Sequence, residues 1–363
     1  MSGAVQPATI LVTGGAGFIG SAVVRYLLAS TEALVVNFDK LTYAANPAAI
    51  AELERHPRYR FVKGCVADRQ AVTEALQSYR PDAVMHLAAE SHVDRAIDGP
   101  EDCIKTNIVG TFVLLESIRH YLAGVEASVG ARFRYHHVST DEVFGSLGPE
   151  GLFSETSPYA PRSPYSASKA SSDHIVRAWS ATYGVPVVLS NTCNNFGPWQ
   201  FPEKLIPLMI LKAVNYEPMP VYGKGEQVRD WLYVDDHAEA LYLILTRGRL
   251  GESYNVGANC ERRNIDVVLA ICDMVDQLLP SKIKNSRRGL ITHVADRPGH
   301  DERYAINASK VRSELGWQPR ESFASGLEKT VRWYIEKSDW WRSVTNYRGE
   351  RLGLAVERPV QPT

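Results

Sequence analysis

The first half of the chain alternates short apolar runs with stretches in which apolar residues recur every three or four positions. The short runs ILVTGG, LVVNFD, YRFVKG, DAVMHLAA and YHHVST predict strands, and VPVVLSNT predicts a sixth. The intervening stretches, such as FIGSAVVRYLLAS, RQAVTEALQSY and IKTNIVGTFVLLESIRHYL, predict helices. This order favours right-handed β-α-β units in a parallel sheet whose two faces are both covered. We therefore expect an α/β protein built on a doubly wound parallel sheet.

This alternation stops after about residue 195. Pro and Gly become frequent in NNFGPWQFPEKLIP and NYEPMPVYGKG, and the strand candidates become short and scattered. We expect residues 1–195 to form the first domain and residues 196–363 to form mainly a smaller, irregular α/β domain over the carboxyl ends of the sheet. Because WLYVDDHAEALYLIL is apolar again, segment 230–257 is expected to return to the first domain.

Composition narrows the functional classes. The 363 residues are 45% hydrophobic and carry a formal net charge of −1, without a basic run, which argues against a nucleic-acid partner. The start MSGAVQPATILVTGG does not resemble a signal peptide, and no apolar stretch reaches the ~20 residues of a membrane helix. The five cysteines form no C-x-x-C pair, so we expect reduced thiols and no metal site. A cytoplasmic protein without a membrane partner is expected.

A glycine-rich loop joins the first strand to the first helix. Gly14 allows a tight turn, Gly17 lets a pyrophosphate approach the backbone, and Gly20 permits close packing of helix on strand. Asp39 ends the second strand, about 20 residues on, as a Rossmann-type dinucleotide site requires. An acid there accepts from ribose hydroxyls and repels a 2′-phosphate, so NAD is favoured over NADP, a preference that Lys40 weakens slightly. The alternative is a structural turn with an ordinary strand-end acid.

Tyr165 and Lys169 are four residues apart in SPYSASKASSDHIVRAW, on one face of a helix predicted to begin near Ser163 or Ser166. Tyrosine is a poor base at neutral pH, and a lysine ammonium one turn away favours its phenolate. Such a pair can remove a hydroxyl proton during hydride transfer. A Tyr-x-x-x-Lys pattern also occurs by chance, so its position after a dinucleotide fold is what gives it weight.

These features resemble the extended short-chain dehydrogenase/reductase family of nucleotide-sugar enzymes. The resemblance covers nearly the whole chain and is carried by TGGAGFIG, Asp39, HLAAESHVDRAI, NIVGT at Asn107, and Tyr165 with Lys169. Within the family, STDEVFG, SPYSASKASSDH, NNFGPWQFPEKLIPL, GKGEQVRDWLYVDDHA and DRPGHDERYAI are most similar to the 4,6-dehydratases. The resemblance implies tightly bound NAD, with the following contacts: Gly14, Gly17, Phe18, Ile19, Gly20, Asp39, Lys40, Leu87, Ala88, Ala89, Tyr165 and Lys169.

The triplet Thr140-Asp141-Glu142 follows the fifth predicted strand. An epimerase needs only the tyrosine and a Ser/Thr hydroxyl, whereas a dehydratase must also remove water across C5 and C6, which two carboxyls in opposite protonation states can do. The resemblance implies that Asp141 protonates the C6 hydroxyl, that Glu142 takes the C5 proton, and that Thr140 bonds the C4 oxygen. Hydride then returns from the cofactor to C6, and dTDP-glucose becomes dTDP-4-keto-6-deoxyglucose. The alternative is a pair of solvated turn acids.

Substrate contacts are expected mainly in the second half of the chain. A pyrophosphate requires cationic side chains, and the resemblance suggests Lys204, Arg229 and Arg297. It also suggests further contacts to diphosphate, sugar or nucleoside, each of which could instead be a surface charge or a structural hydrogen-bonding group: Ser91, His92, Asp94, Asn195, Glu203, Asn264, His300 and Tyr304.

Several points stay open at the level of sequence. Gly64-Cys65-Val66 stands where the family has Gly-Asp-Ile, and since a thiol is a weak acceptor the contact to adenine is in question. Cys193 and Asn307 stand where Ser and Asp are common. The rival functions are a 4-epimerase, a nucleotide-uronate decarboxylase, a dehydratase of CDP-, GDP- or UDP-sugars, and a catalytically silent binder of NAD and nucleotide sugar.

The resemblance also implies a homodimer formed through helices at 101–122 and 166–183. Ile108, Phe112 and Leu115 are apolar positions of the first of these helices, and either the dimer seam or the sheet would bury them.

Overall fold

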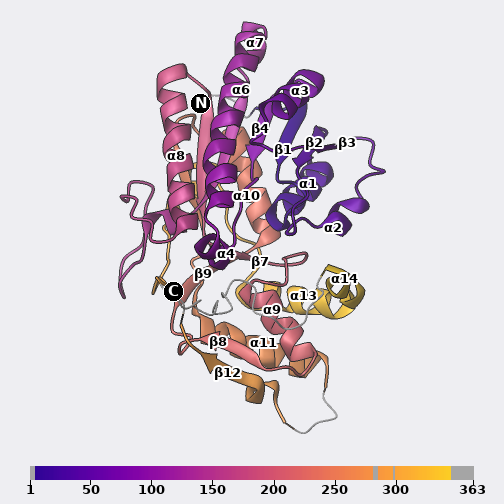
Figure 1. Ribbon diagram of the computed structural model, residues 1–363, viewed down its shortest axis with the longest axis vertical. Coiled ribbons are helices and arrows are strands. Elements are labelled where there is room, and N and C mark those ends of the chain that lie inside the picture. Colours follow the sequence, from indigo (N-terminus) through magenta and orange to yellow (C-terminus); the bar gives the residue numbers. More distant parts are fainter. Residues whose placement is uncertain (1–4, 281–284, 297–298, 345–363) are drawn as a thin grey trace, which may run out of the picture.

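The centre of the molecule is a sheet of seven parallel strands in the order β10-β6-β5-β4-β1-β2-β3. The computed structural model describes residues 5–280, 285–296 and 299–344 (Figure 1). The order 3-2-1-4-5-6 is that of a doubly wound dinucleotide fold, and the predicted fold class is confirmed. The strands are β1 (Thr9–Thr13), β2 (Leu34–Asp39), β3 (Tyr59–Lys63), β4 (Ala83–His86), β5 (Arg134–Thr140), β6 (Val187–Thr192) and β10 (Ser253–Val256).

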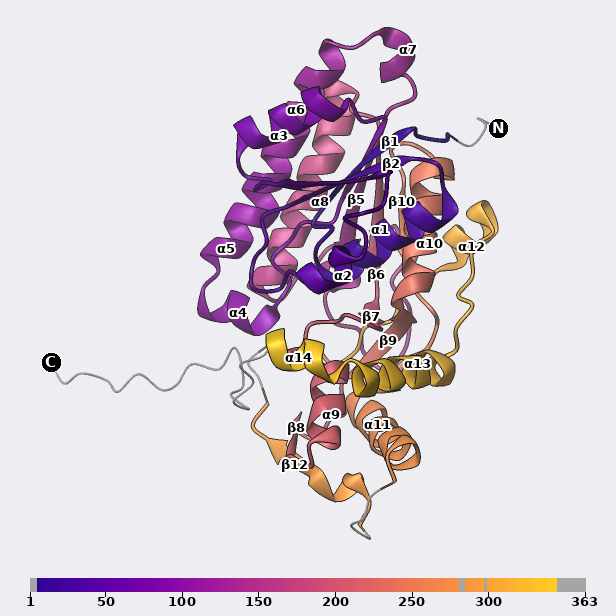
Figure 2. The same cartoon turned by 90° about the vertical axis from the view of Figure 1, so that its right-hand side faces the viewer.

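Helices cover both faces of this sheet, as Figure 2 shows. On one face α1 packs against α10, and on the other α6 lies between α3 and α8. This double covering is the reason that the strands are apolar along nearly their whole length. The helices α1 and α3 have the predicted limits, and Ser163 caps α8 by accepting from the N–H of Ser166. Their bounds are α1 (Phe18–Ser30), α3 (Arg69–Tyr79), α6 (Gly110–Ala123), α8 (Pro164–Tyr183) and α10 (Val234–Arg247).

A π-helical turn, η1 (Ile104–Val109), interrupts the helix expected before α6. The wider turn brings the Asn107 side chain onto the chain just after β4. There the Asn107 Oδ1 accepts from the Glu90 N–H (2.9 Å) and its Nδ2 donates to the Glu90 carbonyl (3.0 Å). Turns of this kind are common at functional sites, and this one holds one wall of the cleft described below.

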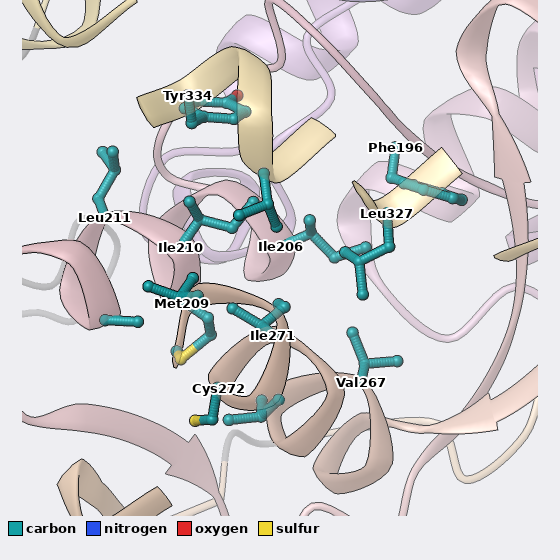
Figure 3. Close-up of a cluster of buried hydrophobic side chains, with 14 of the residues drawn as sticks. Phe196, Ile206, Met209, Ile210, Leu211, Val267, Ile271, Cys272, Leu327 and Tyr334 are labelled. Atoms are coloured by element: carbon teal, nitrogen blue, oxygen red, sulfur yellow. The ribbon is translucent and has the colours of Figure 1, made fainter. Parts of the chain in front are cut away.

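The second half of the chain forms two small sheets and a helical layer. One sheet has the order β11-β9-β7 and the other pairs β12 with β8. Figure 3 shows the core of this part, where Met209, Ile210 and Ile271 from two of its helices lie among other apolar side chains. The elements are β7 (Asn194–Phe196), α9 (Leu205–Val214), β8 (Met219–Tyr222), β9 (Val228–Tyr233), β11 (Glu261–Arg263), α11 (Asn264–Leu278), β12 (Ile291–Val294) and α13 (Phe323–Glu336).

The predicted domain limits stay a prediction, and we propose to keep the division near residue 195. The chain leaves the large sheet at the end of β6 and enters a small sheet with β7. It returns through α10, which packs on α1, and β10, which pairs with β6. The strand β9 before α10 pairs with β7 and β11, so residues 230–233 belong to the small sheet.

The remaining elements of the described chain are short helices and turns. No helix in the described ranges is both long and apolar enough to cross a membrane. The five cysteines are unpaired. The remaining elements are α2 (Pro47–Ala51), α4 (Val93–Asp98), α5 (Glu101–Cys103), α7 (Ala127–Gly130), η2 (Asp141–Phe144), η3 (Arg287–Leu290), α12 (Ser309–Leu315) and α14 (Ser338–Val344).

Candidate active site

The glycine loop between β1 and α1 forms a cradle for a phosphate group. Gly14 has φ +74°, and a Cβ atom there would lie 2.6 Å from the backbone nitrogen of Ala88. Gly17 precedes α1, and no side chain caps that helix, so its first N–H groups stay available to an anion. Asp39 holds the loop in place, because its Oδ2 accepts from the N–H of Ala16 (3.0 Å) and its Oδ1 from the N–H of Leu41 (2.8 Å).

A cleft above the carboxyl ends of the strands starts at this cradle. The residues predicted to bind the cofactor all line it: Gly14, Gly17, Phe18, Ile19, Gly20, Asp39, Lys40, Leu87, Ala88, Ala89, Tyr165 and Lys169. Phe38, Gly64 and Val66 line the part beyond Asp39, where the adenine end of a dinucleotide would lie, whereas the Cys65 side chain does not reach the cleft. The residues present therefore fit NAD, and backbone and apolar surface rather than the thiol face the base.

Lys40 has partners within the protein on the other side of the cleft. Its Nζ pairs with Glu90 Oε1 at 2.9 Å and donates to the Thr106 hydroxyl at 3.2 Å. Because Glu90 compensates this charge, we expect Lys40 to weaken the preference for NAD little, and its effect stays a prediction.

The triplet after β5 opens the 3-10 turn η2, and its middle residue is buried. Asp141 is 1% exposed; its Oδ1 accepts from the Thr140 hydroxyl (3.4 Å), and its Oδ2 has no hydrogen-bond partner among the described residues. Burial raises the pKa of Asp141 well above its ordinary value, and the charges of Glu142 and Asp230 act in the same direction. Burial thus favours the protonated form of Asp141, the form that a general acid needs. This excludes a solvated turn acid at Asp141.

A stability measurement tests this protonation state. Because the folded-state pKa of Asp141 is raised, its contribution to stability is present at low pH and is lost as the pH rises from the unfolded value of about 4 toward the folded one, by up to ~1.4 kcal/mol per pH unit. Asp141→Asn is expected to unfold at a higher temperature than wild type at pH 8, with a smaller difference at pH 5. Thermal unfolding at both pH values measures this, with the exposed acid variant Glu150→Gln as control. A difference that does not change with pH would contradict it.

Tyr165 and Lys169 both point from α8 into the site. Lys169 Nζ donates to the backbone carbonyl of Val138 (2.9 Å), and burial lowers its pKa to about 8. Burial, with the charges of Glu142 and of the nearby acids, raises the pKa of Tyr165 well above its ordinary value. Burial is the largest effect on Tyr165 and the Lys169 ammonium is bonded to β5, so the expectation that Lys169 favours the phenolate stays a prediction.

A second cleft, on the side of the small sheets, meets the first. The two share Ser91, Glu142, Asn194, Phe201, Glu203 and Lys204. Glu142 therefore faces both clefts beside Tyr165, where a sugar carbon next to the cofactor would lie. Among the predicted substrate residues, Asn195 lines the first cleft and Arg297 lies outside the described residues. The others line the second cleft, and their roles stay predictions: Ser91, His92, Asp94, Glu203, Lys204, Arg229, Asn264, His300 and Tyr304.

Arg229 is held rigidly in the second cleft. Its guanidinium donates to the backbone carbonyls of Asp301 (2.9 Å) and Val228 (2.8 Å) and lies 4.2 Å from the centre of the Tyr304 ring. The Tyr304 hydroxyl in turn donates to the Asp301 carboxylate. Nearby, His300 Nδ1 lies 2.7 Å from Asp296 Oδ1. A cation held in this way is a suitable fixed partner for a diphosphate.

Glu203 makes contacts within the protein that its sequence motif did not predict. Its carboxylate accepts from the Tyr43 hydroxyl (3.2 Å) and lies 3.5 Å from Arg95 Nε and 3.6 Å from His92 Nε2. The Arg95 guanidinium also lies 3.7 Å from the centre of the Tyr43 ring. Tyr43 and Arg95 had no sequence signal, because the contact joins three segments that are distant in the chain. Lys204 similarly donates to the Ser91 carbonyl (2.9 Å).

Comparison of the sequence with known proteins agrees with this geometry. A family model for GDP-mannose 4,6-dehydratase matches residues 11–330. The chain is 57% identical over 349 residues to dTDP-glucose 4,6-dehydratase of Neisseria meningitidis, covering 95% of this chain and 98% of that one. It is 55% identical over 340 residues to dTDP-glucose 4,6-dehydratase 1 of Escherichia coli K12, covering 91% and 94%.

Solved structures agree as well. The dTDP-glucose 4,6-dehydratase of Streptomyces venezuelae with NAD and dTDP bound matches with a TM-score of 0.85 and 42% identity, over 93% of this chain and all of that one. The UDP-glucose 4-epimerase of Thermus thermophilus with NAD matches at 0.79 and 28%, over 91% and 99%. The epimerase shares the fold at lower identity, so the difference between the two activities rests on the site. With its nucleotide cleft, the buried Asp141 and the adjacent Glu142 at the end of β5, the chain belongs to the dTDP-glucose 4,6-dehydratase family of NAD-dependent short-chain dehydrogenase/reductase enzymes.

Proposed function

We propose that this protein converts dTDP-glucose to dTDP-4-keto-6-deoxyglucose by eliminating water across C5 and C6, with NAD regenerated in each turnover. The observation that carries the proposal is the pair Asp141 and Glu142 at the end of β5. The first carboxyl is buried and its pKa is raised by that burial, while the second faces the junction of the two clefts. A 4-epimerase has no use for such a pair, and neither does a protein that only binds its ligands.

Each residue of the site has a separate task in this reaction. The Tyr165 oxygen takes the proton of the C4 hydroxyl, and Thr140 hydrogen-bonds the same oxygen. Glu142 removes the C5 proton, which the C4 ketone makes acidic, while Asp141 protonates the departing C6 hydroxyl. When bound, NAD would accept the hydride from C4 and return it to C6. Glu142, protonated once it has taken the C5 proton, would then give a proton back to C5.

The choice of dTDP rests on the second cleft and on the relatives. Leu208, Met209 and Val221 line the part of the cleft away from the cofactor and offer an apolar surface to the methyl group of thymine. One methyl group is worth only ~1–3 kcal/mol in a pocket. The relatives at 57% and 55% identity are named for dTDP-glucose. UDP-glucose is therefore the competing substrate most worth testing.

Product analysis tests the proposal directly. The purified protein is mixed separately with dTDP-glucose, UDP-glucose, CDP-glucose and GDP-mannose, first without and then with added NAD, and the products are followed by NMR. We expect a 4-keto-6-deoxy sugar from dTDP-glucose, and more slowly, if at all, from UDP-glucose. A galacto-configured product would indicate the epimerase instead. Absence of any product in all mixtures with NAD would favour a silent binder.

We also propose that the protein is a homodimer joined through α6 and α8. Apolar side chains on this face are unusually exposed: Ile104 51%, Phe112 37% and Tyr183 53%. The Phe112 and Trp179 rings meet edge to face at 5.7 Å, which joins the two helices into one surface. Leu115 is fully buried in the sheet core, so the ambiguity about that position is resolved in favour of the sheet.

Phe112→Glu is expected to weaken the dimer at least ~30-fold, because it places a charge at the centre of an apolar interface. Light scattering over a range of concentrations measures the change. Leu152→Glu, at a similarly exposed position away from this face, is the control and is expected to leave the mass unchanged. A Phe112→Glu variant with an unchanged dimer mass would place the interface elsewhere.

We propose a cytoplasmic location on the ground that all five cysteines are unpaired thiols. Free thiols are typical of reducing compartments.

A further inference from the structure

Asp173 is a buried carboxylate one helical turn after Lys169 that no part of the proposed reaction uses. It lies on α8 with no exposed surface, and the hydrogen bonds that it accepts gather on one of its oxygens, Oδ2. Oδ2 accepts from the hydroxyls of Ser139 (2.8 Å) and Tyr159 (2.8 Å), and Oδ1 lies 3.2 Å from His137 Nε2. A carboxylate with this many donors is held in one position and in its ionised form.

The same carboxylate connects the elements that carry the reaction. Asn191 on β6 directs its Nδ2 to Asp173 Oδ2 (3.4 Å) and to the backbone carbonyl of Thr140 (3.1 Å). Ser139, which donates to Asp173, directly precedes Thr140 on β5. Asp173 therefore joins α8, β5 and β6 at the end of β5, next to Thr140.

Asp173 also supplies the negative charge that buried Lys169 needs. An isolated ammonium is costly in a protein interior unless a partner compensates it. Burial lowers the pKa of Lys169 to about 8, and the charge of Asp173 is the effect that opposes this. Although burial raises the pKa of Asp173, the hydrogen bonds from His137 and Ser139 and the charge of Lys169 hold it below its ordinary value.

Of the other titratable groups facing this pair, only Arg177 carries a charge, and it acts on Tyr159, which bonds Asp173. Burial keeps the pKa of His137 at about 4 and lowers that of His86 well below its ordinary value, so both rings are neutral at pH 7. Burial raises the pKa of Tyr135, so this phenol keeps its proton. The groups that face Asp173 or Lys169, grouped by element, are His86 on β4, Tyr135 and His137 on β5, Tyr159 in the loop before α8, and Tyr165 and Arg177 on α8.

We propose that Asp173 is a positioning residue of this site, whose buried carboxylate keeps Lys169 as an ammonium and holds the Thr140 end of β5 against α8. Asp173 touches neither substrate nor cofactor and acts through Lys169 and Thr140. The kinetic part of the inference rests on the proposed function, whereas the charge pair itself does not.

The kinetic test compares Asp173→Asn with Tyr159→Phe, which removes one hydrogen bond to the same oxygen without changing charge. With dTDP-glucose and holoenzyme, we expect Asp173→Asn to lower kcat at pH 8 by ~10-fold or more and to change KM less than ~3-fold. The alkaline limb of its kcat–pH profile should move about one pH unit lower, because a one-unit decrease in the pKa of Lys169 lowers the ratio of ammonium to amine tenfold. Tyr159→Phe should change kcat less than ~3-fold and leave the limb in place. An unshifted limb in Asp173→Asn would overturn the proposal.

A thermal unfolding cycle tests the pair without any substrate. Removing one of two opposite buried charges leaves the other uncompensated, so Asp173→Asn is expected to melt below the double variant Lys169→Met/Asp173→Asn. If the double variant folds but Asp173→Asn does not, the result supports the proposal in the same way. The proposal fails if the melting temperature of the double variant falls by the sum of the decreases in Asp173→Asn and Lys169→Met. It also fails if the double variant does not fold while Lys169→Met does. If wild type converts no nucleotide sugar, the proposed function is wrong, and this unfolding cycle still tests whether Asp173 compensates the charge of Lys169.

Discussion

Asp141→Asn is expected to slow loss of the C6 hydroxyl by about 10³-fold while changing oxidation at C4 less than ~10-fold, because a positioned general acid contributes ~10²–10⁴. Asparagine keeps the shape and the hydrogen bond from Thr140 but carries no transferable proton. The side chain stays in the same buried surroundings, so the substitution changes only the ability to donate a proton. Rapid mixing with dTDP-glucose separates the steps, since the reduced cofactor absorbs in the near ultraviolet and should accumulate on the enzyme.

Glu150→Gln, an exposed acid shortly after η2, is the matched control and should leave both steps unchanged. Equal loss of oxidation and dehydration in Asp141→Asn would contradict the assignment. In that case the carboxyl would serve the shape of the turn, and the proton would come from another group.

Glu142→Gln is expected to abolish exchange of the C5 hydrogen with deuterated water, a decrease of at least ~10²-fold, while the bound NAD content stays that of wild type. Glu142 lines both clefts beside the proposed position of the sugar and is not part of the glycine cradle. The amide cannot accept the C5 proton. NMR of recovered dTDP-glucose measures the exchange, and the absorbance spectrum of the purified variant measures the cofactor.

The two variants should therefore fail at different points. Asp141→Asn keeps the base and is expected to retain exchange at C5, whereas Glu142→Gln loses it. Normal exchange in Glu142→Gln would remove this residue from the base role and would favour Tyr165 as the group that serves both C4 and C5.

The sequence alone was sufficient wherever the deciding interactions are local. The limits of α1 and α3 follow from periodicity, and the start of α8 follows from its Ser163 cap. The cradle at Gly14 follows from a turn that only glycine adopts easily. The triplet at the end of β5 could be located as well, because parallel strands present their carboxyl ends to a common cleft.

Some placements needed the tertiary structure, because they depend on segments far apart in the chain. Glu203 meets Tyr43 and Arg95 only after three segments fold together, so a motif could not show that its carboxylate already has partners. The π-turn η1 is invisible to periodicity, which reads residues 104–122 as one helix.

Protonation is the clearest case of what folding decides. The sequence determined that a tyrosine, a lysine and two acids are present at spacings that suit a dehydratase. Only the folded chain decides how much water each loses and which charges it meets: burial raises the pKa of Asp141 and of Tyr165, and the buried Asp173 lies one helical turn from Lys169. The physical reason is that desolvation depends on everything packed around a group, whereas the sequence shows only its neighbours along the chain.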